Sequence, residues 1–351
     1  MNKNNLNLLE TIINIMQMDI DCIVCVTSYL TSLNYYLISK DVYKRVIISE
    51  KQNLWKNLYN KFFTDLKKEY LILKFNDYNW KREYLRIIKF KYFDKINNKV
   101  THLDLSCLDI ERIPKEFGNL VQLHFIQFHR NKINIIPYEL CGLTNLRYLG
   151  ISNNIIKYIP KELENLINLE ELNMSHNIIE IIPTELFNLN NLSSLNMSGN
   201  MISEIPKGIS NLKNLKRLNF SQNQIKVMPI EFNFILEKMN FSQNNISEIP
   251  KELDKLTNLK FLYLNGNHIK KIPKEIGNMT KLIELYLHNN QIKELPEELG
   301  QLNKLNKFYI NDNQIKNIPE SLKEHMNYLQ IFSVYVTKYN DIASKFIQYL
   351  L

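Results

Sequence analysis

The stretch LEELNMSHNIIEIIPTELFNL, residues 169–189, contains the pattern that decides the fold of this chain of 351 residues. Apolar residues recur in it at fixed offsets around one asparagine and one proline, Asn177 and Pro183. The segment from Leu172 to Met174 alternates apolar and polar residues, which is typical of a short strand with one buried face. Proline fixes φ and removes a backbone donor. The stretch therefore predicts a short strand, a turn, and a proline at the entrance to the next segment.

The same frame, LxxLxLxxNxIxxIPxxLxxL, recurs in ten copies from Val100 to about Leu322. Consecutive prolines are 23 residues apart, except for one interval of 21 between Pro229 and Pro250. The asparagine amide both donates and accepts hydrogen bonds, so stacked copies can satisfy backbone groups left unpaired where each strand turns. We assign this structural role to Asn131, Asn154, Asn177, Asn200, Asn223, Asn244, Asn267, Asn290 and Asn313. The first repeat has Leu108 there, as expected of an atypical end unit.

This frame resembles that of the leucine-rich-repeat family. The resemblance implies an α/β repeat solenoid, a curved array with a parallel sheet on its concave side and short helices or 3₁₀ turns on its convex side. The two residues missing between Phe232 and Leu236 should shorten one convex segment without interrupting the strands. A fold of this kind binds other proteins and supplies geometry, not catalysis.

Outward positions of the strands can be assigned to columns, because strands stacked in register about 4.8 Å apart place residues 23 apart side by side. Tyrosine and arginine with a few apolar neighbours are typical anchors of protein interfaces. Such residues gather at both ends of the predicted sheet, and we predict that they bind a target protein. The alternative is that the tyrosines stack on one another and only stiffen the sheet. The predicted target-binding residues are Phe125, Tyr148, Arg130, Phe261, Tyr263, Tyr286 and Tyr309.

Residues 1–99 differ from the repeats in patterning and in charge. They contain 17 Lys/Arg against 10 Asp/Glu, whereas residues 100–351 contain 27 against 26, and their apolar residues follow helical spacing. These lysines are interleaved with acidic and aromatic residues, which indicates solvated helix faces and neither a nucleic-acid nor a membrane surface. We predict a small all-helical domain over 1–99, ten repeats over 100–322 and a C-terminal cap over 323–351.

The segment from about residue 15 to 60 resembles an F-box through Tyr29-Leu30, the stretch from Leu37 to Lys40, and Leu54-Trp55. The later Trp80 resembles the tryptophan of the helix that often follows an F-box. Met18-Asp19 replaces the usual Leu-Pro at the start. The resemblance implies docking on a Skp-type adaptor and a cullin scaffold. The implied adaptor-docking residues are Ile20, Ile23, Val24, Leu30, Leu33, Leu54 and Trp55.

Two functions of different class follow. In the first, the chain is the substrate-recognition subunit of a Skp-cullin-F-box ubiquitin ligase and captures a target on its concave face. Chains of this Asn- and Ile-rich style resemble F-box proteins of amoebae and of their giant DNA viruses. In the second, the helical block caps the open end of the solenoid, and the chain is an intracellular scaffold or signalling adaptor similar to the Ras-suppressor type.

Catalytic and metal sites are not expected. The sequence has no GxxxxGK[ST], no GxGxxG opening a helix, no HExxH and no GxSxG, so we expect neither an enzyme nor a cofactor. Cys22 and Cys25 form a CxxC without a second pair, and the three histidines of the first two repeats fall in different columns, so we expect no metal. Without a signal peptide or a membrane-spanning apolar run, we expect the cytoplasm (the host cytoplasm for a viral chain), with the nucleus as a further compartment.

Overall fold

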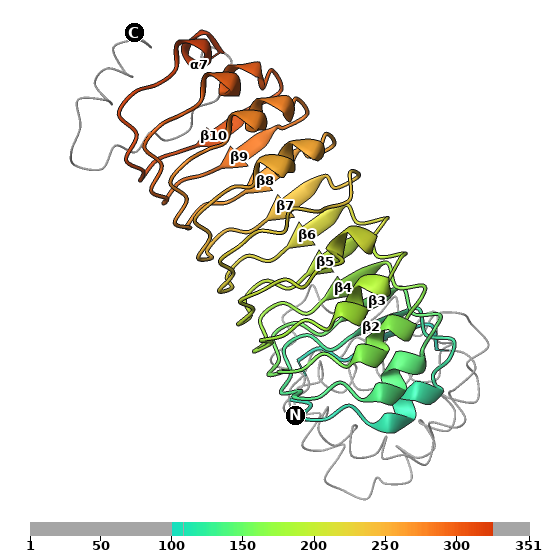
Figure 1. Cartoon of the computed structure of the whole chain (residues 1–351). Helices are drawn as coiled ribbons and strands as arrows, with labels where there is room; N and C mark the ends of the chain where they lie inside the picture. Colours follow the sequence, from blue (N-terminus) through green and yellow to red (C-terminus); the bar gives the residue numbers. More distant parts are fainter. Residues whose placement is uncertain (1–99, 108, 326–351) are drawn as a thin grey trace, which may run out of the picture. The chain divides into compact units, whose positions relative to one another are not determined.

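The computed structural model describes residues 100–107 and 109–325. Ten strands lie in chain order in a single sheet, and every neighbouring pair is parallel (Figure 1). The predicted solenoid of parallel strands is thereby confirmed, whereas the helical block predicted before it lies outside the described residues. The strands are β1 (His102–Asp104), β2 (Phe125–Gln127), β3 (Tyr148–Gly150), β4 (Glu171–Asn173), β5 (Ser194–Asn196), β6 (Arg217–Asn219), β7 (Lys238–Asn240), β8 (Phe261–Tyr263), β9 (Glu284–Tyr286) and β10 (Lys307–Tyr309).

The register of the sheet follows the repeat length. Phe125 pairs with Tyr148, 23 residues later, and the other full-length repeats pair in the same way. The 21-residue interval keeps equivalent positions opposite each other, because Asn219 pairs with Asn240. The two missing residues are therefore taken out of the connection between β6 and β7, and the strand ladder continues through it.

The connections on the other side of the array form 3₁₀ helices. Seven of the eight begin directly after a repeat proline whose φ lies between −63° and −73°, the value that the proline ring imposes. The 3₁₀ helices are η1 (Lys115–Asn119), η2 (Tyr138–Gly142), η3 (Lys161–Asn165), η4 (Thr184–Asn188), η5 (Ile209–Asn211), η6 (Lys251–Lys255), η7 (Lys274–Asn278) and η8 (Glu297–Gln301), and the α-helix α7 (Glu320–His325) follows the last repeat.

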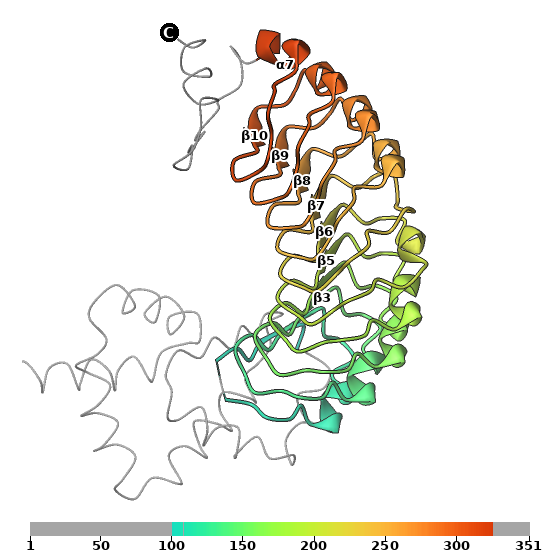
Figure 2. The same cartoon turned by 60° about the vertical axis from the view of Figure 1, so that its left-hand side comes forward.

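The array curves, with the strands on its inner side and the 3₁₀ helices on its outer side (Figure 2). Strands can stack about 4.8 Å apart, whereas helical turns with side chains between them need more room. The strand side is therefore the shorter one. This curvature makes the outward residues of the strands the lining of a concave face.

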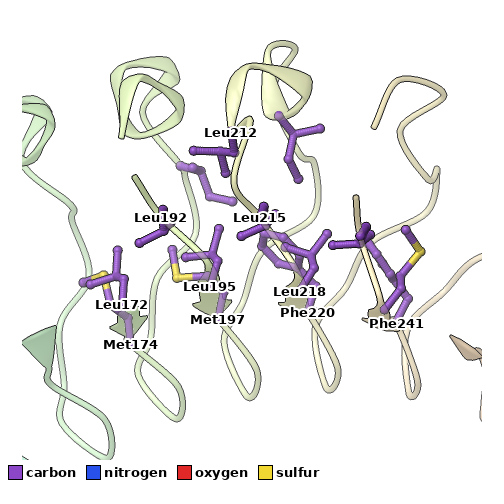
Figure 3. Packing of buried hydrophobic residues seen from close by; sticks show 14 of the residues in the cluster. Leu172, Met174, Leu192, Leu195, Met197, Leu212, Leu215, Leu218, Phe220 and Phe241 are labelled. Carbon is purple, nitrogen blue, oxygen red and sulfur yellow. The ribbon is translucent and has the colours of Figure 1, made fainter. Parts of the chain in front are cut away.

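One continuous apolar core fills the space between strands and helices. Leu172, Leu195 and Leu218 project inward from three neighbouring strands, and Met174 and Phe220 follow them in the next inward position (Figure 3). Each of these side chains is at most 1% exposed. Burying a side chain of this size stabilises the fold by about 1.5 to 3 kcal/mol, so every repeat depends on its two neighbours for most of its stability.

A ladder of buried asparagines closes the turn after each strand. The Asn177 amide donates to the carbonyls of Met174 and, in the preceding repeat, Ile151, both at 3.0 Å, and its Oδ1 accepts from the backbone N–H of Ile156 at 3.0 Å. The other asparagines assigned to this role make the equivalent bonds. Each asparagine thus satisfies backbone groups of the repeat before its own.

The residue before each ladder asparagine adopts a left-handed conformation. Its φ is +53° at His176, +56° at Gln222 and +65° at Gly199. This conformation reverses the chain sharply at the end of the strand, so that the asparagine that follows can turn inward. Glycine adopts it without strain, whereas other residues pay a steric cost.

Candidate functional site

The concave face carries an aromatic cluster at its N-terminal end. His102, Phe125 and Tyr148 lie on β1, β2 and β3 in one outward column. Their rings are nearly parallel, with centroids 5.8 Å apart for the first pair and 4.4 Å for the second. We call these three residues the N-terminal aromatic cluster. It presents a row of half-buried ring edges and faces on a rigid sheet.

Gly150 makes room for the Tyr148 ring. A Cβ atom at Gly150 would lie 2.8 Å from Tyr148 Cε1, closer than side chains tolerate. The ring therefore leans across the strand next to the glycine, and its hydroxyl reaches Gln127 Oε1 at 3.5 Å. Burial raises the pKa of Tyr148 above its ordinary value, so the hydroxyl stays protonated and keeps donating to Gln127.

Arg130 is not part of this cluster. The structure places it in the turn after β2, exposed, with a left-handed φ of +53°. It precedes the ladder residue Asn131 and lies beyond the two outward columns. Of the seven predicted target-binding residues, six thus fall into two clusters, and Arg130 lies at the rim.

The second cluster occupies the C-terminal end of the face. Tyr263, Tyr286 and Tyr309 are neighbours in one column, with ring centroids 4.7 and 4.5 Å apart and interplanar angles of 69° and 74°. Phe261 lies on the same strand as Tyr263, one outward position earlier. We call these four residues the C-terminal aromatic cluster. Its three tyrosine rings pack edge to face, a geometry that aromatic pairs favour.

A carboxylate is held against this cluster. Glu284 accepts a hydrogen bond from the Tyr263 hydroxyl at 2.7 Å and pairs with Lys307 at 2.9 Å. Burial acts to raise the pKa of Glu284, but the hydrogen bonds from Lys307 and Tyr263 outweigh it and lower that pKa. Burial and the same carboxylate raise the pKa of Tyr263. The group is therefore an anionic carboxylate whose charge is already satisfied within the face.

Lys238 was not among the predicted site residues. Its Nζ lies 5.3 Å from the centroid of the Tyr263 ring and 6.0 Å from that of Phe261. The register that groups the tyrosines also places Lys238 beside Phe261, so the column arrangement contained a signal for it. The contact itself depends on where a long, flexible side chain turns, which the repeat pattern does not determine.

The strands between the clusters present polar residues. Asn173, Asn196 and Asn240 each accept a hydrogen bond from the backbone N–H of the serine two residues later, at 2.9 to 3.1 Å. Arg217 pairs across two strands with Glu171 at 3.0 Å. The two aromatic clusters are therefore separate surfaces on one face.

The histidines of the first two repeats do not converge. The Nδ1 atom of His129 lies 2.7 Å from the Ser152 hydroxyl, whereas His102 stacks on Phe125. Burial and the adjacent Arg130 lower the pKa of His129. Among residues 100–107 and 109–325, no group of three or more His, Cys, Asp or Glu side chains could hold a metal ion.

A second exposed apolar surface lies on the flank of the array, after the turn. It consists of residues one and four positions after a ladder asparagine, and all are exposed. Among the later repeats the second of these positions carries Glu204, Glu248 and Lys271, and the exposed Val227 at the same position is separated from this surface by the repeat with Glu204. The run of apolar residues at these positions in neighbouring repeats was a signal for this surface in the sequence itself. We call this surface the flank patch; its members are Ile135, Tyr158, Ile181, Ile155, Ile178 and Met201.

Comparison with known proteins agrees with this geometry. A family model described as a leucine-rich repeat region matches residues 88–198, 138–239 and 235–350, which together span well over half of the chain. The chain belongs to the leucine-rich-repeat family. Among solved structures, this leucine-rich-repeat chain is similar to a leucine-rich-repeat protein of Leptospira interrogans, with 30% identity, a TM-score of 0.62, and coverage of 73% of this chain and 71% of that one.

It is also similar to an internalin from Listeria monocytogenes, with 28% identity, a TM-score of 0.63, and coverage of 72% of this chain and 73% of the internalin. No curated protein sequence matches the chain. Leucine-rich-repeat proteins are in general protein-binding scaffolds, typically without catalysis of their own. In the part of this leucine-rich-repeat chain that the structure describes, no helix is long and apolar enough to cross a membrane. All seven adaptor-docking residues predicted from the F-box resemblance lie outside the described residues.

Proposed function

We propose that this leucine-rich-repeat protein recruits a target protein on its concave face as the substrate-recognition subunit of a Skp-cullin-F-box ubiquitin ligase. The observation that carries the binding function is the pair of aromatic clusters, each half-exposed and held on a rigid sheet. The F-box-like segment supports the link to ubiquitin. In this proposal the protein supplies geometry, and other subunits supply the ubiquitin transfer.

The aromatic clusters suit binding for a physical reason. Their rings are already ordered by stacking and by the Tyr263–Glu284 hydrogen bond, so a partner that covers them loses little side-chain entropy. Large, pre-ordered aromatic side chains commonly contribute most of the energy of an interface. The polar strands between the clusters would form the wetter part of the same interface.

A second candidate is an intracellular scaffold or signalling adaptor without a ubiquitin role. The repeats support both functions equally, since the concave face is the same in each. Residues about 15–60 discriminate between them. An F-box offers Ile23 and Leu30 to a partner helix, whereas a capping block turns them toward the first repeat.

Capture of a Skp-type adaptor by the full-length chain tests the ubiquitin role. We expect wild type to retain the adaptor and Ile23→Asp and Leu30→Asp to lose it. Val227→Asp introduces the same charge at an apolar residue of the repeats that is 76% exposed, and it should bind like wild type. Circular dichroism must show that each variant is folded. A folded wild-type chain that fails to retain the adaptor contradicts the ubiquitin role and favours the scaffold.

A further inference from the structure

Positive charge gathers on the concave face just before the C-terminal aromatic cluster. At the N-terminal ends of β6, β7 and β8, and in the residues that precede them, the face carries Lys216, Arg217, Lys238 and Lys260 against the single acid Glu237. Lys260 is paired with Glu237 at 2.8 Å. The remaining three cations give this part of the face a local excess of positive charge.

Lys216 and Lys238 are the cations left without a carboxylate. Arg217 reaches back across two strands to Glu171, so its charge is satisfied on the side away from β7. Lys216 and Lys238 are exposed, and no acid within residues 100–107 and 109–322 lies at ion-pair distance from either. Their ammonium groups can therefore bind an anionic group of another molecule.

The ammonium of Lys238 lies against aromatic rings. It lies over the rings of Tyr263 and Phe261, and ring faces attract a cation without occupying its N–H donors. A carboxylate that approaches from the concave side can take these donors while the aromatic contact persists. The apolar surface for the rest of the partner begins directly beside it.

The spacing between charge and apolar surface has a definite size. Lys238 lies on β7, Tyr286 on β9 and Tyr309 on β10. With strands about 4.8 Å apart, these positions are separated across the sheet by roughly 10 and 14 Å. An extended segment advances about 3.3 Å per residue, so three or four residues span the distance.

We propose that β6 to β10 of the concave face is the docking site of an extended acidic segment of the partner protein. The segment has an Asp or Glu pair, which binds Lys238 and Lys216, and an aromatic or large aliphatic residue three or four positions away, which packs on Tyr286 and Tyr309. This inference rests on the proposed function and gives the chemistry of its target.

The charges of the face disfavour other occupants. A basic segment would bring like charge to Lys216 and Lys238, while the nearby Glu284 is already satisfied by Lys307 and Tyr263. A nucleic acid needs a larger charge excess than residues 100–351 offer, with 27 Lys/Arg against 26 Asp/Glu. The tyrosines also pack edge to face on one another, an arrangement that leaves few open ring faces for stacked bases.

The test is a selection of displayed random peptides on the full-length protein, followed by fluorescence anisotropy of the enriched peptides. We expect enrichment of acidic peptides with an apolar residue at the stated spacing. Lys238→Glu and Tyr286→Ala should each weaken their binding on the order of tenfold. The matched control is Lys226→Glu, the same charge change at an exposed lysine after the turn of the preceding repeat, which should leave affinity within about twofold.

A charge-swapped peptide, with Lys in place of the acidic pair, should bind Lys238→Glu better than wild type. Enrichment of peptides without acidic residues, or binding that a folded Lys238→Glu variant leaves intact, overturns the inference. If such peptides lose binding on Phe125→Ala, the concave face still functions and only the assigned chemistry fails. If neither cluster matters for any enriched peptide, the proposed function of the face fails as well. Displacement of the peptides by single-stranded DNA at equal concentration would reassign the surface to nucleic acid.

Discussion

At the scale of single residues, the ladder asparagines stabilise the fold by satisfying buried backbone groups. Asn177 is 7% exposed, and its Oδ1 accepts from the backbone N–H of Ile156, which is buried as well. Removing the amide leaves that N–H without its acceptor in a buried site, whereas the Ile151 and Met174 carbonyls each keep a second donor, Asn154 and Asn200. Buried polar groups that lose their partners are costly.

We therefore expect Asn177→Ala to lower the free energy of unfolding by about 1 to 3 kcal/mol. Urea denaturation followed by circular dichroism measures the change. Asn134→Ala is the matched control, because Asn134 is exposed, and it should shift stability by less than about 0.5 kcal/mol. Equal stability of the two variants would show that the hydrogen bonds of the Asn177 side chain do not stabilise the fold.

A buried thiol makes stability depend on pH. Burial, with smaller contributions from Glu162 and Glu139, raises the pKa of Cys141 from its ordinary value near 9 to about 12. Between these two values the unfolded chain releases the proton and the folded chain keeps it. The unfolded state then binds fewer protons, so the free energy of unfolding falls as pH rises above about 9.

We expect this group alone to lower stability by about 1 kcal/mol between pH 8 and pH 10. Urea unfolding at both pH values should show a smaller decline for Cys141→Ala than for wild type. Cys107→Ala changes the exposed cysteine and retains Cys141, so it should decline like wild type. An identical decline in all three proteins would contradict the assigned origin.

Prediction from sequence was most complete for residues whose role the repeat itself determines. The ladder asparagines could be named because their position is the same in every unit. Lys238 could not, because its ring contacts depend on the rotamer of a long side chain that crosses between strands. The pairing of Gly150 with Gln127 follows from the repeat length, but its role as the space for Tyr148 became visible only with the ring in place.

At the scale of elements, the connection between β6 and β7 differs from the others. It contains no 3₁₀ helix, and Phe234 within it is 59% exposed, whereas Phe187 in η4 is fully buried. The side chain of Asn233 bridges this connection to the preceding repeat through the Leu212 carbonyl at 2.8 Å. Fewer buried contacts hold this segment than hold its neighbours, which is the condition for local opening.

We expect chymotrypsin to make its first cut within residues 100–325 after Phe234. Limited digestion with mass spectrometry of the fragments identifies the site. Phe187 serves as an internal control, because the same protease recognises it and its burial in η4 should protect it. Earlier cleavage after Phe187 would mean that the missing helix does not weaken the segment.

Sequence predicted the existence of each element better than its bounds. The alternating LxL segments became strands, and the proline positions became the starts of helices. There are two exceptions: no helix follows Pro229, and η5 begins at Ile209 after Gly208 with φ +105° and not directly after Pro206. Gly208, in the left-handed region, delays the start of η5 to Ile209. The repeat frame has no glycine at this position, so it does not predict the delay.

At the scale of the whole molecule, every repeat contributes equivalent residues to one core. We therefore expect the protein to tolerate the loss of one repeat. Deletion of residues 174–196 removes 23 residues and joins Asn173 to Met197, which preserves the frame. We expect a folded array with one strand fewer and stability reduced by about 1 to 3 kcal/mol, at roughly 0.1 kcal/mol per residue.

Circular dichroism and urea denaturation measure this outcome. Deletion of residues 174–185 removes only twelve residues and puts the following strand out of phase with the sheet. It should cost far more stability than the larger deletion. The opposite order of stabilities would show that chain length, and not register, governs folding.

The fold as a whole was predictable because one short frame fixes strand register, core and turn at once, and ten copies repeat the information. The concave site was predictable only as columns of residues. Its contacts involve charges and rings from different repeats, where the frame leaves the sequence free to vary. That freedom is what allows one architecture to present many different surfaces.

The asparagine ladder has a direction, since each amide serves the turn of the repeat before it. A repeat duplicated by recombination therefore carries the asparagine that the turn of the preceding repeat needs. Its own turn is satisfied by the asparagine of the repeat that follows. No new contacts have to evolve where the duplicated repeat meets its neighbours. A gene built this way can gain or lose whole repeats by unequal crossing-over. The length of the binding face can therefore change in steps of one strand.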